Sequence, residues 1–222
     1  MINADAPVSY ATKRSNFRNG GGMFDHEKTS AKDLTRRART DARLNEAVME
    51  QLASRGYGRL TIEKVATSSG VAKTTIYRRW ASKAEMVFEI AIHNSNQTPL
   101  PDTGSLVGDV QAISERAVQL VAGKVGRIVL PGLLADMAND DALNQRLQTT
   151  FVETARSDIA DVIDRATHRG ELAPGADLDG FHAALLGIPF AYVHLLGITD
   201  VEQMTTNLTK QLLALLTVPS PS

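Results

Sequence analysis

The stretch from Gly56 to Glu85 constrains the fold of this chain more than any other segment. After Thr61, apolar residues recur at helical spacing, so a helix of about two turns is expected to begin at this N-cap. The apolar positions are Ile62, Val65 and Ala66. Gly70 closes the run and suits the left-handed backbone conformation that a sharp turn requires. The pattern therefore predicts the first helix and the turn of a helix-turn-helix.

The segment after the turn, Ala72–Trp80, is short and polar on most sides. Few residues at or beside it have core character, so its main role is not to fill a core. These residues are Val71, Ile76 and Trp80. Ser82 and Glu85 then have capping-box spacing, which predicts the start of a further helix. Its expected buried positions are Ala84, Val87, Phe88 and Ala91.

These residue types suit a motif that reads duplex DNA, in which the second helix enters the major groove and the first lies across the backbone. Lys73 is suited to donate to guanine O6 and N7, and Thr74 and Thr75 offer hydroxyl and methyl groups to base edges. Hydroxyl and cationic side chains elsewhere in the motif suit phosphate contacts. The expected DNA-binding residues are Thr61, Lys73, Thr74, Thr75, Tyr77, Arg78 and Lys83.

The distribution of charge favours double-stranded DNA as the partner. Residues 1–83 contain 16 Lys and Arg against 8 Asp and Glu, whereas residues 84–222 contain 8 against 17. A basic N-terminal part suits a polyanion, and an acidic remainder is repelled from it. The alternative is that the cations of the motif form an ordinary solvated surface. The turn spacing and the cap signals on both sides favour DNA.

The ordered motifs of this region are Gly56-Tyr57, Thr61, Val65-Ala66, Ser69-Gly70-Val71, Thr75-Ile76-Tyr77, Trp80 and Ser82-Lys83-Ala84-Glu85-Met86. They resemble the signature of the TetR family of bacterial transcriptional regulators, over roughly Arg39 to His93. The resemblance implies DNA-facing roles for Thr61, Lys73, Thr74, Thr75, Tyr77 and Lys83. It also implies a second domain that holds a small-molecule pocket and a four-helix dimer interface. Ala72 departs from the family's usual Ser or Thr N-cap, and Thr74 stands where many members have Gly.

An all-α fold is expected, because Gly and Pro are sparse within the periodic segments and β-branched alternation is nearly absent. The chain divides into a disordered N-terminal arm (1–33), a three-helix helix-turn-helix DNA-binding domain (34–93) and a helical regulatory and dimerisation domain (104–218). The arm is either a basic minor-groove contact or a tail without a role. Whether the chain starts at Met1 or at Met23 is left open.

A homodimer is expected from the last two helical segments. The run Phe181–Ile198 is the most apolar in the chain, and a helix that is apolar on most sides must be buried on most sides. The next segment, Val201–Leu216, has an approximate heptad of apolar residues, and two such helices from each subunit would form a four-helix interface. The heptad positions are Val201, Met204, Leu208, Gln211 or Leu212, and Leu215. A dimer places two recognition helices about 34 to 36 Å apart, on successive major grooves of a palindrome.

Four residues of the second domain are candidate ligand contacts, because each is adaptable or polar-tipped within an apolar segment. They are Met137, Phe151, His182 and Tyr192. An expected helix break at Pro131-Gly132 is a further reason to place a pocket among these helices. The alternative is that all four residues belong to the core or to the dimer interface.

Several classes of protein are disfavoured by what the sequence lacks. Without cysteine, disulfides, thiol chemistry and Cys-based metal sites are excluded. His168, His182 and His194 lack the i, i+4 spacing of a metal site, and no GxGxxG, GxxxxGK[ST] or GxSxG motif occurs. No cofactor, metal, membrane partner or enzymatic activity is therefore expected. The start does not resemble a signal peptide, which favours the cytoplasm.

The combined expectation is a ligand-responsive transcriptional regulator that binds a palindromic operator as a homodimer and is released by a small apolar or aromatic ligand. Repression, rather than activation, rests on the family resemblance alone. Two alternatives stay open. One is a helical small-molecule-binding protein or enzyme with a non-functional helix-turn-helix, and the other is a non-specific DNA-organising protein.

Overall fold

A computed structural model describes residues 23–94 and 98–217, with the side chains in these ranges except those of 23–34, 150–154 and 217. The described residues up to Thr40 belong to one compact unit, and those from Asp41 onward belong to a second. Helix α1 (Met23–Arg55) contributes to both units.

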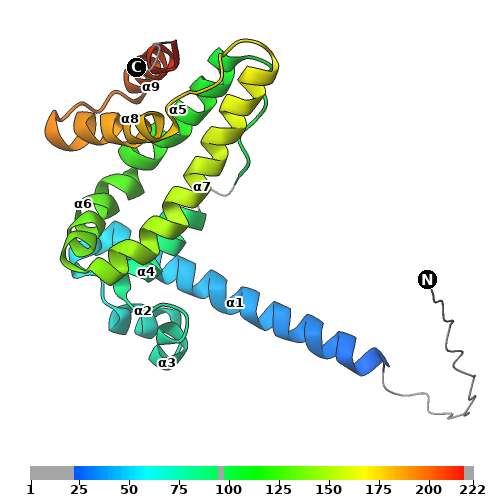
Figure 1. Ribbon diagram of the computed structural model, residues 1–222. Coiled ribbons are helices and arrows are strands. Elements are labelled where there is room, and N and C mark those ends of the chain that lie inside the picture. Colours follow the sequence, from blue (N-terminus) through cyan, green and yellow to red (C-terminus); the bar gives the residue numbers. More distant parts are fainter. Residues whose placement is uncertain (1–22, 95–97, 218–222) are drawn as a thin grey trace, which may run out of the picture. The chain divides into compact units, whose positions relative to one another are not determined.

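The described residues form helices and no strand, as the sequence predicted (Figure 1). After α1 come η1 (Tyr57–Arg59), α2 (Ile62–Ser69), α3 (Lys73–Tyr77), α4 (Lys83–Val87), η2 (Phe88–His93), α5 (Leu106–Ala122), α6 (Lys124–Asn139), α7 (Asp141–His168), α8 (Leu178–Phe190), η4 (Ala191–Leu195) and α9 (Val201–Thr217). Within the described ranges, no single helix combines the length and hydropathy of a membrane span, and the pair α5–α6, bent by 71°, meets both criteria only when taken together.

Helix α1 begins at Met23, whereas the sequence predicted disorder through residue 33. From Met23 to Arg55 the chain contains neither Gly nor Pro, so no residue in this stretch interrupts a helix. The first part of the stretch has no regular apolar stripe, which is why periodicity did not place it in a helix. The rest of the predicted arm, residues 1–22, lies outside the described residues.

Two hydrophobic cores hold the second unit together. The first joins the helices of the helix-turn-helix to α6 and α7, and the second joins α5, α7, α8 and α9. From α6 and α7, the first core takes Val129, Leu133, Leu143 and Leu147. One hydrophobic core therefore contains residues of both expected segments, 34–93 and 104–218. The helix-turn-helix completes its core with residues from the following domain.

Helix α6 runs without a break from Lys124 to Asn139, although an interruption was expected at Pro131-Gly132. Val129 and Leu133 are buried on either side of the proline, and this packing maintains the helix despite the backbone hydrogen bond that proline lacks. Gly132 has a different role from the expected one. A Cβ at this position would overlap the ring of Tyr57, so the glycine permits η1 to pack closely on α6.

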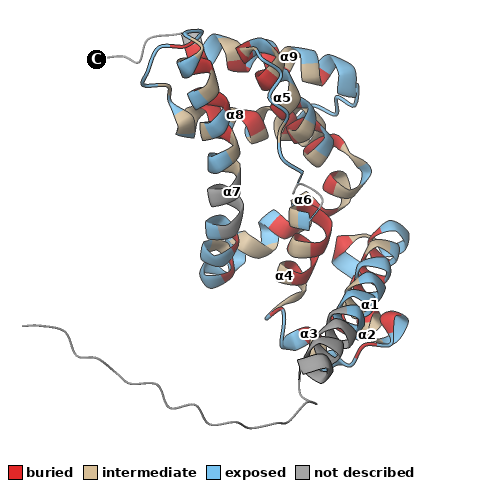
Figure 2. Cartoon of the chain, turned by 90° about the vertical axis from the view of Figure 1, so that its right-hand side faces the viewer, coloured by how far each residue is buried: buried red, intermediate tan, exposed pale blue. Residues whose placement is uncertain are grey.

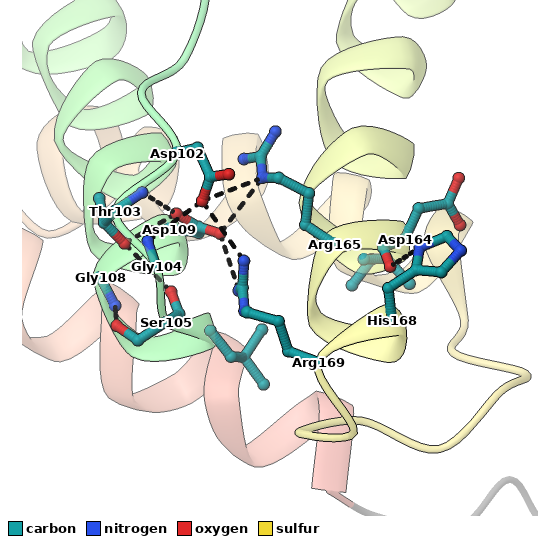
Figure 3. Close-up of polar contacts among 12 residues, drawn as sticks. Asp102, Thr103, Gly104, Ser105, Gly108, Asp109, Asp164, Arg165, His168 and Arg169 are labelled. Carbon is teal, nitrogen blue, oxygen red and sulfur yellow. Dashed lines mark hydrogen bonds and ion pairs between the residues drawn. The ribbon is translucent and has the colours of Figure 1, made fainter.

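A polar network ties the start of α5 to the end of α7 (Figure 3). Asp109 is buried, and its Oδ1 accepts hydrogen bonds from the backbone N–H and the Oγ1 of Thr103, both at 2.8 Å. Its Oδ2 lies 3.1 Å from Arg169 Nη2 and 3.4 Å from Arg165 Nε. Burial alone would raise the pKa of Asp109, but the hydrogen bonds from Thr103 and Arg169 and the charge of Arg165 lower it to about 2. The carboxylate therefore stays charged and fixes two distant segments together.

Helices α8 and α9 pack on α5, at the end of the second unit opposite α2 and α3 (Figure 1). Three residues of the α9 heptad, Met204, Leu208 and Leu212, are buried in the second core. These three positions were expected to face a partner subunit but pack inside their own subunit, because they cover the apolar face of α5. The heptad positions Val201 and Leu215 are exposed, as are Leu195, Leu196 and Ile198.

Candidate nucleic-acid interface

The turn between α2 and α3 has the geometry that the sequence predicted. The Thr61 hydroxyl caps α2 by accepting a hydrogen bond from the backbone N–H of Lys64 at 3.3 Å. Gly70 ends the helix in the left-handed region, at φ 62° and ψ 24°. A Cβ at Gly70 would also overlap the guanidinium group of Arg43. The flexible Arg43 side chain can move away, so it is the left-handed backbone conformation that favours glycine at this turn.

Helix α3 presents one face to the first core and the other to solvent (Figure 2). Ile76 is fully buried, and Val71 and Trp80 are buried at the two ends of the segment. The exposed residues with polar side chains are Lys73, Thr74, Tyr77, Arg78 and Arg79, with Thr75 half-buried beside them. Ala72 is the N-cap and makes no side-chain capping bond, as the departure from the family pattern indicated. Most of the predicted DNA-binding side chains thus share one accessible surface.

Two cations of this surface have carboxylate partners. Lys73 Nζ lies 3.1 Å from Glu63 Oε1, and both side chains are more than half exposed, at 51% and 56%. The N–H of Glu63 itself, in the first turn of α2, and then Lys73 hold the pKa of Glu63 below its ordinary value. Arg79 pairs with Asp41 of α1 and lies over the Trp80 ring, 4.5 Å from its centroid. Solvent screens such pairs, so an approaching phosphate or base can replace the carboxylate.

Helix α4 begins as predicted, with one difference in its cap. Ser82 Oγ accepts a hydrogen bond from the backbone N–H of Glu85 at 3.1 Å. Glu85 Oε2 accepts in return from the N–H of Ala81 at 2.7 Å, one residue earlier than a capping box requires. The second oxygen of Glu85 lies 2.5 Å from Arg146 Nε of α7. The cap thus also connects the DNA-binding part to the following domain.

Lys83 lies at a second junction between the helix-turn-helix and α6. Its Nζ is 3.7 Å from Asp136 Oδ2 and 4.1 Å from the centroid of the Tyr57 ring. The Tyr57 hydroxyl donates to the same Asp136 oxygen at 2.5 Å. Burial raises the pKa of Tyr57 well above its usual range, and the hydrogen bond to Asp136 and the charge of Asp136 raise it further. The phenol therefore keeps its proton and acts as the donor.

Sequence reasoning missed Glu63, Asp136 and Gly132 as parts of this region. Glu63 was visible as an exposed acid in the first turn of α2, and its pairing with Lys73 depends on the angle of the turn. Tyr57 belongs to the recognised motif string, but no sequence signal joins it to Asp136, 79 residues later.

Two sequence profiles match the chain. The profile of the tetracyclin repressor-like C-terminal domain matches residues 100–214, which is more than half of the chain. The profile of bacterial regulatory proteins of the tetR family matches residues 45–90, which contain α2, α3 and α4. The chain belongs to the TetR family. The resemblance inferred from the motifs is thereby confirmed.

Curated relatives of this TetR-family protein are also helix-turn-helix regulators. An uncharacterised HTH-type transcriptional regulator of Mycobacterium tuberculosis is 35% identical over 131 residues, which are 58% of this chain and 63% of that protein. The match thus spans less than two thirds of that relative's length. The DNA-binding transcriptional repressor TetR of Mycobacteroides abscessus is 29% identical over 140 residues, which are 62% of this chain and 72% of the repressor.

Solved structures of TetR-family proteins share the fold. The crystal structure of a TetR family transcription regulator has a TM-score of 0.63 at 27% identity, and the match covers 78% of this chain and 96% of that one. Salmonella enterica GusR has a TM-score of 0.60 at 16% identity, with 81% of this chain and 96% of that chain covered. These matches show that the chain has the fold of TetR-family proteins.

Two of the four ligand-contact candidates, Met137 and Tyr192, lie against different cores of this TetR-family chain. Met137 packs against the first core and Tyr192 against the second, while the side chain of Phe151 lies outside the described residues. His182 is half-buried, and its Nε2 is buried without a hydrogen-bond partner among the described residues. Two cavities of about 420 Å³ are lined by described residues, and neither includes Met137, His182 or Tyr192.

Proposed function

We propose that this TetR-family protein is a transcriptional repressor that reads a palindromic DNA operator by inserting α3 into the major groove. The observation that carries the proposal is the exposed polar face of α3, held at a fixed angle to α2 by the left-handed Gly70. The repressor role is supported by similarity to the Mycobacteroides abscessus repressor, which is named as DNA-binding. Its place of action is the bacterial cytoplasm, where its DNA target lies.

The exposed residues divide into two proposed roles. Lys73 and Thr74 stand at the start of α3, where side chains of a recognition helix reach base edges. Thr75, half-buried beside them, contributes its hydroxyl at the margin of the groove. The residues proposed to bind phosphates are Thr61, Tyr77, Arg78 and Lys83.

We propose a homodimer that forms through α8, η4 and the edges of α9. Leu195 and Leu196 are 75% and 65% exposed, and they continue into the exposed Ile198 and Val201. Several exposed apolar residues close together in the chain are typical of a protein interface. The α9 residues Met204, Leu208 and Leu212 are assigned to the subunit core, so the interface uses the remaining faces of these helices.

The proposed release signal is a small apolar or aromatic ligand. A ligand that binds a conformation with wrongly spaced recognition helices weakens DNA binding. By linkage, DNA weakens ligand binding by the same factor. The polar anchors would be His182 and also His194, whose Nε2 atom likewise has no partner among the described residues. Burial, and then the charges of Arg156 and Arg127 respectively, lower the pKa of both rings. Neutral rings suit an uncharged ligand. Met137, Phe151 and Tyr192 remain candidate contacts.

The proposal is tested by selecting binding sites from random duplex DNA with the full chain, then measuring affinity for the selected site at fixed salt. Lys73→Ala should weaken binding to that site by roughly 5- to 150-fold, which is the discrimination expected of one good base contact. The matched control is Lys124→Ala, which removes an exposed lysine from the start of α6, outside the motif, and should change affinity less than twofold.

Two results would contradict the proposal. Failure to enrich any sequence, with binding that falls steeply with salt, would indicate a non-specific DNA-organising protein. Absence of binding to any duplex would indicate a small-molecule-binding protein or enzyme whose helix-turn-helix is non-functional.

A further inference from the structure

We propose that Asp136 of α6 competes with a DNA phosphate for the ammonium group of Lys83, so that Asp136 lowers the affinity of the protein for its operator. This inference rests on the proposed DNA-binding function and assigns a role to a residue outside the helix-turn-helix. The partner class is the phosphate backbone of the operator, and the competing group is a carboxylate of the same chain.

The first step is the position of Lys83. It is the first residue of α4 and one of the cations proposed to bind phosphate. Its side chain is 27% exposed, so the ammonium group is accessible while it lies 3.7 Å from Asp136 Oδ2. An ammonium group has three donors, but a carboxylate beside it repels an incoming phosphate. Binding DNA through Lys83 therefore requires this ion pair to loosen.

The second step is that Asp136 is held in place to compete. The Tyr57 hydroxyl donates to its Oδ2 at 2.5 Å, and the Tyr57 ring is buried. That ring packs where Gly132 leaves room, one helical turn before Asp136. Lys83 lies over the ring, 4.1 Å from its centroid. Tyr57 thus positions the Asp136 carboxylate by a hydrogen bond, and the face of the Tyr57 ring stabilises the Lys83 ammonium group.

The third step separates this pair from the other ion pairs of the interface. Lys73 and Glu63 both belong to the helix-turn-helix, and more than half of each side chain is exposed. Lys83 and Asp136 are less exposed, at 27% and 41%, and they connect α4 to α6. Screening weakens the Lys73 pair more, so removing the carboxylate should matter more at Lys83. Asp136 therefore acts on operator binding through Lys83, by competing for its ammonium group.

The test measures affinity for the selected operator at fixed salt with the full-length protein. Asp136→Asn removes the charge but keeps an oxygen that accepts the Tyr57 hydrogen bond. It should bind about 3- to 20-fold more tightly, because a partly exposed pair is released in each of two subunits. The matched control is Asp141→Asn, which removes one exposed acidic charge from the start of α7 and should change affinity less than twofold.

A double-mutant cycle with Lys83→Met distinguishes competition at Lys83 from a general effect of charge. Lys83→Met alone should weaken binding, and adding Asp136→Asn to it should give no gain. Unchanged or weaker binding by Asp136→Asn, or an equal gain in the Lys83→Met background, would overturn the inference. If Asp136→Asn does not fold, Asp136→Ser, which also removes the charge, decides by the same criteria.

Failure of this inference differs visibly from failure of the proposed function. If the unaltered protein selects an operator but Asp136→Asn does not tighten binding, only the inference is overturned. If the unaltered protein selects no duplex at all, the proposed function fails and the inference fails with it.

Discussion

Replacing Asp109 by Asn tests whether the polar network between α5 and α7 stabilises the fold. The pKa of Asp109 is about 2 in the folded protein, compared with an ordinary value of 3.8. A depressed folded-state pKa stabilises the fold above the ordinary pKa, and this stabilisation is lost as the pH falls toward the folded-state value. The difference corresponds to about 2 kcal/mol of unfolding free energy at pH 7 and about 1 kcal/mol at pH 3.

The measurement is urea unfolding of the unaltered protein and of Asp109→Asn at pH 7 and at pH 3. We expect Asp109→Asn to lose at least about 2 kcal/mol at pH 7, or roughly 4 to 8 °C in Tm for a domain of this size. The gap between the two proteins should narrow by about 1 kcal/mol at pH 3. Asp102→Asn is the control, because Asp102 faces the same arginines but is 60% exposed, and its loss should be under about 1 kcal/mol. The reasoning would be refuted if Asp109→Asn and Asp102→Asn lost the same unfolding free energy at pH 7. It would also be refuted if the loss caused by Asp109→Asn were the same at pH 7 and pH 3.

Two other predictions concern packing. Gly132→Ala should destabilise the fold by about 1 to 2 kcal/mol in thermal unfolding, because overlap with the Tyr57 ring outweighs the gain of about 1 kcal/mol in helix propensity. In a Tyr57→Leu background, most of the overlap should be relieved. If Gly132→Ala destabilised the Tyr57→Leu variant as much as the unaltered protein, this explanation would be contradicted. Leu195→Glu should convert a species of twice the 24.0 kDa chain mass into a monomer in light scattering, because the residue is exposed in the subunit. Val107→Glu, at an exposed position on α5, should leave the mass unchanged, and a dimer that survives Leu195→Glu would exclude η4 from the interface.

The helix-turn-helix was predictable because its determinants are local. The Thr61 cap, the left-handed Gly70 and the Ser82 cap each depend on residues within about four positions, and each is found as predicted. The burial of Ile76 and Trp80 was predicted from their apolar character within a polar segment. Family motifs added the likeness to known regulators, which the profile matches confirm.

The remaining errors involve competition between partners that are distant in sequence. The apolar stripe of α9 was visible, but sequence alone does not show whether Met204 and Leu208 pack on α5 of the same subunit or on a second subunit. Pro131 signalled a break, yet packing of its neighbours in the first core keeps α6 continuous. The contact between Tyr57 and Asp136 joins residues 79 positions apart, so no local pattern reports it.

The sharing of the first core between the helix-turn-helix and the α6–α7 region limits how this protein can be divided for engineering. A fragment that stops at His93 would lack Val129, Leu133, Leu143 and Leu147, and the apolar surfaces that they cover would meet water. A chimeric regulator that takes its operator preference from this chain therefore has to inherit residues 124–147 as well, or redesign the surface that they leave.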